Sequence, residues 1–374
     1  MAQETKKITE LTALSAFTLE TLFVTHDGTG ARKATMQQLW DFFPMMGNNA
    51  GAHNGIYRGK RLGTTTPTAE QFAAISAGTF KDMYIGDYWT INSVTWRIVA
   101  FDYYMNCGDN NGGTETFPGS AGDVTFNYIG KVSAHHVTIM PDTVITVNVP
   151  MNTSNTTDGG YAGSKMRRGV ITYSAAAGTD YYDNADLTGD PVGQLQDATT
   201  VTPQSGATPG YASFLIEETT YYVNMTAVTS SYDVKHSGLY DAKNQIIAAF
   251  GASHILAHRK YLQDTVANGV CTAGAWYNSF CEIPTEMNMY GTTIYKAMNS
   301  NNVLHVNATV DKSQFPLFRF RPDLIHNKDR WFWLQDVVTS QRFAFVGHPG
   351  YVLSYASSYH YNSGGVRPVF SIIG

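Results

Sequence analysis

The C-terminal stretch 329–374 restricts the possible folds more than any other part of the chain. Short apolar runs alternate there with turn-forming residues, and no helical period survives. Gly and Pro interrupt regular structure at residues 348–350 and again at 364–365. This pattern predicts a succession of short β-strands.

The segment "SYASSYHYNS", residues 354–363, precedes the last apolar run and contains only Ser, Tyr, Ala, His and Asn. Antibody combining loops use a similar set of residues, in which Tyr supplies rigid contact area and Ser or Asn supplies adaptable hydrogen bonds. A solvated loop rich in turn formers would have the same composition. The segment is therefore a candidate recognition surface, with an ordinary surface loop as the alternative.

Elsewhere the patterns predict short helices and strands, so the expected fold class is α+β. Residues 66–78 predict a short helix with Thr66 as N-cap and with Phe72 and Ile75 on its buried face. Residues 87–104 alternate large apolar residues around the turn formers Asn92-Ser93, which predicts a β-hairpin.

The longest helical pattern covers residues 239–266. Gly251 interrupts it, so the helix is expected to be kinked or divided at that point. The apolar residues that recur at helical intervals are Ile246, Phe250, Ile255 and Leu262.

A chain of 374 residues is long enough for two or three domains. Residues 8–40 predict strand, turn and strand or short helix. The N-terminal segment 1–50 is too small to hold a core alone and needs a partner chain or a neighbouring domain to be stable. The Gly/Asn-rich residues 47–55 are read as a hinge before a main domain, 51–374. Residues 169–237 are turn-rich and low in core residues, which indicates an inserted β-rich excursion.

Charge and composition argue against several classes of partner. Charged residues make up 15% of the chain, the net charge is −5, and no Lys/Arg run occurs, so nucleic acid is not an expected partner. No apolar stretch approaches the 18 or so residues that would span a bilayer, and the N-terminus lacks a signal-peptide pattern. We therefore expect a soluble protein without membrane insertion.

No motif assigns a catalytic or metal centre. His254 and His258 stand four apart on the expected helix, a spacing that suits a shared metal, but no third ligand is apparent and ordinary helix histidines are the favoured reading. The acidic residues 183–190 miss the ligand order of a calcium loop.

Cys107, Cys271 and Cys281 are read as free thiols, with a Cys271–Cys281 bridge as the alternative. No cofactor or metal is expected.

"WFWLQDVV", residues 331–338, followed by "GGVRPVF", residues 364–370, resembles the variable proteins of diversity-generating retroelements. Their C-terminal domains have a C-type lectin fold related to the formylglycine-generating enzyme, and their best-studied member is a trimeric receptor-binding protein at the tail-fibre tips of a bacteriophage. Residues 58–109 and 248–262 are similar to phage tail proteins from gut bacteria. Residues 8–39 are similar to the virion-docking start of such proteins.

In that family, buried strands form a fixed scaffold while adenine-containing codons near the end are mutagenised. The resemblance implies the following scaffold residues here: Trp331, Trp333, Leu334, Val366, Arg367, Pro368 and Phe370. It implies a ligand-facing set drawn from Arg342, His348, Tyr351, Leu353, Tyr355, Ser358, Tyr359, His360, Tyr361 and Asn362.

The resemblance implies a non-enzymatic receptor-binding protein in the distal tail of a phage virion. Its partners would be a bacterial surface receptor, either protein or glycan, other tail proteins through residues 1–50, and two further copies in a homotrimer. The related enzyme uses cysteines on this fold, but Cys271 and Cys281 stand outside any matching motif, so that activity is not expected. The alternatives are a structural tail or decoration protein and a surface-glycan hydrolase.

Overall fold

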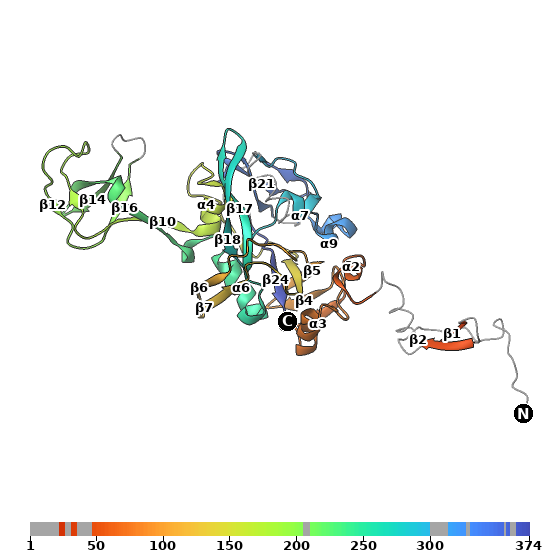
Figure 1. Ribbon diagram of the computed structural model, residues 1–374. Helices are drawn as coiled ribbons and strands as arrows, with labels where there is room; N and C mark the ends of the chain where they lie inside the picture. Colours follow the sequence, from red (N-terminus) through yellow and green to blue (C-terminus); the bar gives the residue numbers. More distant parts are fainter. Residues whose placement is uncertain are drawn as a thin grey trace, which may run out of the picture.

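The computed structural model describes residues 22–26, 31–35, 47–204, 210–299, 313–326, 330–354, 357–359 and 364–374. Within these ranges the chain forms mixed α and β structure that is mostly sheet, which confirms the coarse fold class. The ribbon shows a main body, the insertion projecting from one side of it, and the N-terminal strands on the other (Figure 1).

The first sheet of the main body contains both the first and the last strand of that body. Its order is β24-β8-β5-β4-β3, in which β3 pairs parallel with β4 and the other neighbours pair antiparallel. Its strands are β3 (Arg61–Gly63), β4 (Tyr88–Ile91), β5 (Val94–Phe101), β8 (His136–Pro141) and β24 (Phe370–Ile373). The expected hairpin is confirmed, because β4 and β5 are joined by Asn92 and Ser93, whose φ values of 50° and 64° suit a two-residue hairpin turn.

The second sheet contains most of the C-terminal strands. Its order is β22-β21-β20-β23-β9. Its strands are β9 (Thr146–Val147), β20 (Phe332–Thr339), β21 (Arg342–Val346), β22 (Val352–Leu353) and β23 (Gly365–Val366). The prediction of short strands in the C-terminal stretch is confirmed.

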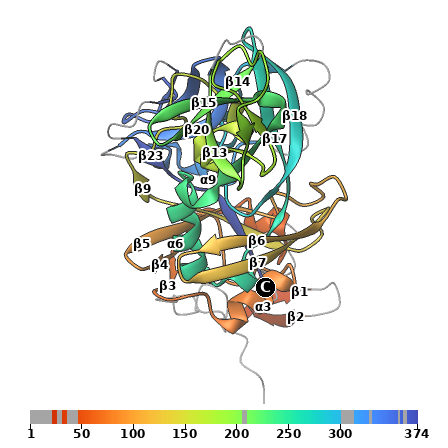
Figure 2. The ribbon, with the colours of Figure 1, turned by 90° about the vertical axis from the view of Figure 1, so that its left-hand side faces the viewer.

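Two smaller ribbons complete the body. The hairpin of β6 (Gly113–Gly119) and β7 (Gly122–Tyr128) lies beside helix α6 (Tyr240–Phe250), to which the Ser120 N–H donates a 2.8 Å hydrogen bond at Asn244 Oδ1 (Figure 2). The other ribbon has the order β17-β18-β19. Its strands are β17 (His258–Ala267), β18 (Val270–Ser279) and β19 (Met298–Asn299).

Short helices cover the edges of the sheets. They are α2 (Ala50–His53), α3 (Ala69–Ser76), α4 (Gly160–Gly163), α5 (Lys165–Arg168), α7 (Glu286–Tyr290) and α9 (Pro316–Phe320), with 3-10 turns η3 (Met225–Ala227), η4 (Val234–His236), η5 (Ala252–His254) and η6 (Pro322–Leu324). Helix α3 buries Phe72 and Ile75 as expected, but its N-cap is Thr68 and not Thr66. The reason is a capping box, in which the Thr68 and Gln71 side chains each accept the other's backbone N–H.

The prediction of a long helix over residues 239–266 is wrong for the second half of this range. Helix α6 ends at Phe250, and Gly251 then adopts φ 79°, a left-handed region in which a helix does not continue. A 3-10 turn follows, and His258 begins β17. Leu262 therefore belongs to a strand, and its helical spacing from Ile246 and Phe250 is coincidental.

The expected hinge at 47–55 is also wrong. The Asn49 side chain caps the one-turn helix α2 by accepting the N–H of Ala52 at 3.0 Å. His53 at its end is buried, and its ring stacks on Tyr84 at 4.7 Å between centroids. Further upstream, β1 (Leu22–His26) and β2 (Ala31–Thr35) form the antiparallel pair that the sequence predicts.

The strands of residues 169–237, which the sequence predicts to be an insertion, form a β unit with its own sheets. Its main sheet has the order β15-β14-β13-β10-β16, and it has its own apolar core around Ala212 and Val223. Its strands are β10 (Val170–Ala175), β11 (Asp180–Tyr181), β12 (Gly193–Gln194), β13 (Thr199–Pro203), β14 (Tyr211–Ile216), β15 (Thr219–Asn224) and β16 (Val228–Asp233). Because Val170 pairs with Asp233, the chain enters and leaves the unit side by side.

The helices in the described ranges include none that is both long and apolar enough to cross a membrane.

Candidate functional site

The predicted scaffold residues of the C-terminal stretch are all buried. Trp331 and Trp333 meet edge to face at 4.8 Å between centroids, and Trp333 Nε1 donates to the Val149 carbonyl at 2.8 Å. Phe345 of β21 packs against both indoles. Tryptophan pairs of this kind bury a large apolar area while the indole N–H keeps a partner, so they fix β20 firmly in place.

Arg367 is the most unusual member of this scaffold, because its side chain is buried with no carboxylate bonded to it among the described residues. Its guanidinium donates to the carbonyls of Pro141, Leu324 and Ile325 at 2.8, 3.0 and 2.9 Å. It also lies 5.3 Å from the ring centre of Phe332. One side chain thus ties the C-terminal strand region to β8 and to η6.

Four members of the predicted ligand-facing set lie on the surface. Tyr351 is 54% exposed and Tyr359 is 47% exposed, which places both among the most exposed large side chains of the described ranges. Arg342 at the start of β21 and His348 in the following turn are also exposed. An exposed tyrosine on a fixed backbone is a typical contact residue of a binding surface.

Two further members are less accessible. Ser358 is fully buried, because its hydroxyl donates to the Ser154 carbonyl at 2.9 Å and its N–H donates to the Gln341 carbonyl at 2.9 Å. Leu353 is half-buried against the second apolar core. Tyr355, His360, Tyr361 and Asn362 lie outside the described residues.

The exposed members do not form one cluster. Strand β22 pairs with the far end of β21, at Phe345 and Val346, whereas Ser357 bridges to Arg342 at its beginning. The five residues of β21 separate these ends by roughly 14 Å at the usual strand rise. The candidate surface is therefore a strip along the outer edge of the second sheet, with His348 and Tyr351 near one end and Arg342 and Tyr359 near the other.

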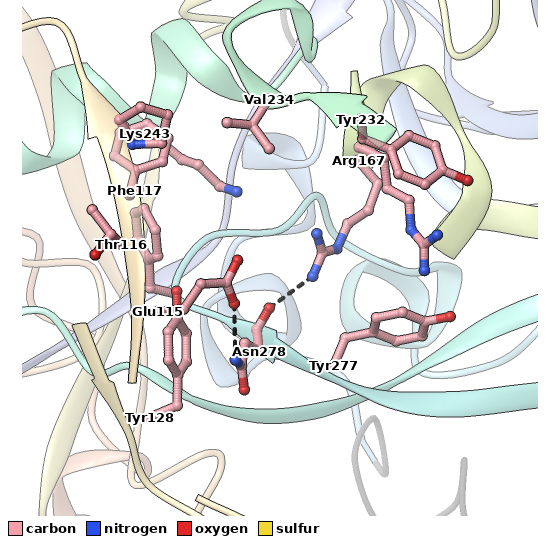
Figure 3. A pocket seen from close by; sticks show the side chains of 13 residues that line it. Glu115, Thr116, Phe117, Tyr128, Arg167, Tyr232, Val234, Lys243, Tyr277 and Asn278 are labelled. Atoms are coloured by element: carbon pink, nitrogen blue, oxygen red, sulfur yellow. Dashed lines mark hydrogen bonds between the residues drawn. The ribbon is translucent and has the colours of Figure 1, made fainter. Parts of the chain in front are cut away.

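A second candidate site is a cleft of about 370 Å³ that the sequence did not reveal. The β6–β7 hairpin, helices α5 and α6, strand β18 and the base of the insertion contribute to its walls (Figure 3). Its cationic residues are Arg167, Arg168 and Lys243. Its aromatic residues are Phe117, Tyr128, Tyr232, Tyr277 and Phe280. These positions are scattered from β6 to β18 without motif spacing, so only the fold brings them together.

The floor of this cleft is a polar network around the carboxylate of Glu282. Arg167 Nε lies 3.0 Å from Glu282 Oε1, and Arg167 donates to the Asn278 carbonyl at 2.7 Å. The hydroxyls of Tyr161 and Ser279 donate to the same buried carboxylate at 2.6 and 2.8 Å. Burial, followed by the nearby charge of Glu282, raises the pKa of Tyr161 well above its ordinary value. The Arg167–Glu282 pair is therefore a fixed, neutral platform.

The rim of the cleft presents charged groups on aromatic faces. The Arg168 guanidinium carbon lies 4.8 Å from the ring centre of Tyr232 and 5.0 Å from that of Tyr277. Lys243 Nζ lies 5.1 Å from the ring centre of Phe280, and burial, with a smaller contribution from Arg167, lowers its pKa. Glu115 Oε2 accepts from Asn278 Nδ2 at 2.8 Å.

The histidines and cysteines singled out by the sequence do not meet. His254 lies in η5 and His258 in β17, so the helical spacing that suggested a metal pair does not exist. The described residues hold no group of three or more His, Cys, Asp or Glu side chains arranged to bind a metal ion. The three cysteines are free and buried, so the alternative Cys271–Cys281 bridge is wrong, and burial raises the pKa of Cys281 to about 12. A thiol of this kind is a poor nucleophile.

Comparison of the chain with protein-family models, with curated proteins and with solved structures finds no match.

Proposed function

We propose that this chain is a phage receptor-binding protein that adheres to a bacterial surface through the strip along β21. The observation that carries the proposal is the pair of exposed tyrosines, Tyr351 and Tyr359, next to strands whose side chains are almost wholly buried. Binding loses less conformational entropy when the backbone under the contact residues is already fixed. The strip has this organisation at both of its ends.

Further parts of the proposal rest on the resemblance of the terminal motif. They are a C-type lectin fold for the main body, codon-directed diversification of the strip, a location in the distal tail of the virion, and docking and trimerisation through residues 1–50. The return of β24 to the sheet that contains β3 is compatible with a closed domain beginning near residue 51. A trimer would present three strips, and such multivalency raises avidity by about 10²–10⁴ when the geometry permits.

Adhesion is tested with fluorescently labelled protein on a panel of gut-bacterial isolates by flow cytometry. On an isolate that the parent chain labels, we expect Tyr351→Ala and Tyr359→Ala each to weaken binding by about 30-fold, the loss for a binding hot spot of about 2 kcal/mol. Leu215→Ala is the matched control, because Leu215 is 68% exposed on the insertion and lies outside the strip. Unchanged labelling by both tyrosine variants would contradict the proposed surface.

The same samples separate the alternative functions. A surface-glycan hydrolase would release soluble sugar from host polysaccharide, which reducing-end assays detect. A structural tail protein would label no isolate.

A further inference from the structure

Two cations of the cleft form no salt bridge among the residues that the structure describes. The Arg168 guanidinium lies over the rings of Tyr232 and Tyr277 and interacts with the charge of Asp158 only at longer range. The Lys243 ammonium lies over the rings of Phe117 and Phe280, and its interactions with the charges of Glu115 and Glu282 are likewise longer-range. Arg167, in contrast, is neutralised by Glu282. The cleft therefore holds unbalanced positive charge, which in a partly desolvated site attracts an anion.

A single carboxylate on the opposite wall limits what that anion can be. Glu115 receives one hydrogen bond, from Asn278, and forms no ion pair within the described ranges. Its carboxylate borders the cleft, into which Lys243 also points (Figure 3). A bare phosphate or sulfate would place negative charge beside this carboxylate, whereas a ligand with hydroxyl groups could donate to it.

The aromatic side chains add a third requirement. Phe117, Phe280 and Tyr277 contribute ring surface to the walls. Such rings pack well against the C–H face of a pyranose ring, and small-molecule sites commonly combine apolar walls with a few placed polar groups. The cleft volume of about 370 Å³ falls within the usual range of such sites, about 300–1,000 Å³.

We propose that the cleft binds a carboxylated sugar residue of an acidic polysaccharide. The sugar carboxylate lies between Arg168 and Lys243, its hydroxyls donate to Glu115, and its apolar face packs on the half-buried ring of Tyr277. None of the lining residues belongs to the C-terminal strands. The inference therefore goes beyond the proposed function, and each can fail without the other.

The proposal is tested on the full chain by isothermal titration calorimetry. The probes are short oligomers of galacturonate, glucuronate, mannuronate and sialic acid, with maltotriose as the neutral sugar and inorganic phosphate as the bare anion. We expect at least one carboxylated oligomer to bind. Lys243→Met and Arg168→Gln should each weaken that binding at least tenfold, and each keeps most of the stem that packs on the rings.

Three controls make the result decisive. Thermal unfolding shows whether each variant is folded, and Arg168→Gln provides the readout if Lys243→Met is not. Arg61→Gln, at an exposed arginine outside the cleft, and Leu215→Ala, at an exposed position of the insertion outside the cleft, should both bind the oligomer as the parent does. The proposal is overturned if no carboxylated oligomer binds, if maltotriose or phosphate binds as tightly, or if both cleft variants keep parental affinity.

Discussion

At the scale of single residues, the C-terminal stretch separates positions that can change from positions that cannot. Gly365 pairs with Val147 across β23 and β9, and a Cβ at this glycine would overlap the Thr146 carbonyl. A Cβ at Gly364 would overlap the Trp331 ring. Overpacking of this kind typically costs about 1–3 kcal/mol, so side chains are not tolerated there.

These constraints predict the pattern of natural variation. Deep sequencing of the gene's 3′ end across a natural population should find substitutions at the exposed Arg342, Tyr351 and Tyr359. Residues 364–370 should stay constant, and so should Ser358, because its buried hydroxyl already serves the Ser154 carbonyl. Variation spread evenly over the stretch, or its complete absence, would rule out diversification of this surface.

The family resemblance predicts this division only in part. It implies that Trp, Val and Phe near the end are scaffold residues and that Tyr351 and Tyr359 are ligand-facing. The burial of Ser358 could not be predicted, because the sequence does not distinguish a serine buried by backbone contacts from a serine in a solvated loop. The cleft was invisible for a related reason, because its cations and rings come from six separate elements.

At the scale of elements, the insertion is attached to the body through two neighbouring strands. Ile171 pairs with Tyr232 and Tyr173 with Ser230, beyond which the unit buries its own small core. An element with its own core contributes little to the stability of the body. The base of the stalk is different, since Tyr232 and Val234 also line the cleft.

We therefore expect residues 174–229 to be removable. Joining Tyr173 to Ser230 through an Asn-Gly turn closes a two-residue hairpin across an existing pair. The melting temperature of the body should move by less than about 4 °C, equivalent to about 1 kcal/mol in a domain of this size. Differential scanning calorimetry measures it, and loss of the body's cooperative transition would show that the insertion is structurally required.

The element boundaries show where sequence patterns lose their value. Ile255 and Leu262 continue the period of helix α6, but Gly251 ends the helix. Leu262 lies in strand β17, and Ile255 forms an isolated bridge with Ile372. Lys260 and Gln263 are buried in β17, although a strand pattern would place such residues outside. Tertiary contacts decide these cases, and periodicity carries no information about them.

At the scale of the whole molecule, buried histidines should make the fold sensitive to acid. Burial lowers the pKa of His53 and His136, and it lowers that of His258 to about 3, with a further contribution from Lys260. The unfolded chain takes up a proton at such a residue near pH 6.5, long before the folded chain does. Stability is therefore full above that pH and falls as the pH drops towards 3.

His258 alone should contribute a slope of about 1.4 kcal/mol per pH unit over this range. The ring centroids of His258 and Tyr104 lie 4.8 Å apart. His258→Phe keeps an aromatic ring at this position and removes the group that takes up the proton. Urea unfolding at several pH values between about 6 and 4 should show a slope reduced by that amount. An undiminished slope in His258→Phe would contradict the assignment.

The chain enters and leaves the insertion through neighbouring strands, and this arrangement also has a consequence for the evolution of the gene. A recombination event that exchanged the DNA between the codons of Val170 and Asp233 would replace one complete module with another. The incoming module would have to match one pair of strands and the cleft wall at Tyr232, since the core of the body does not extend into the unit. Selection could thus change this module in a single step, while the strip along β21 changed residue by residue.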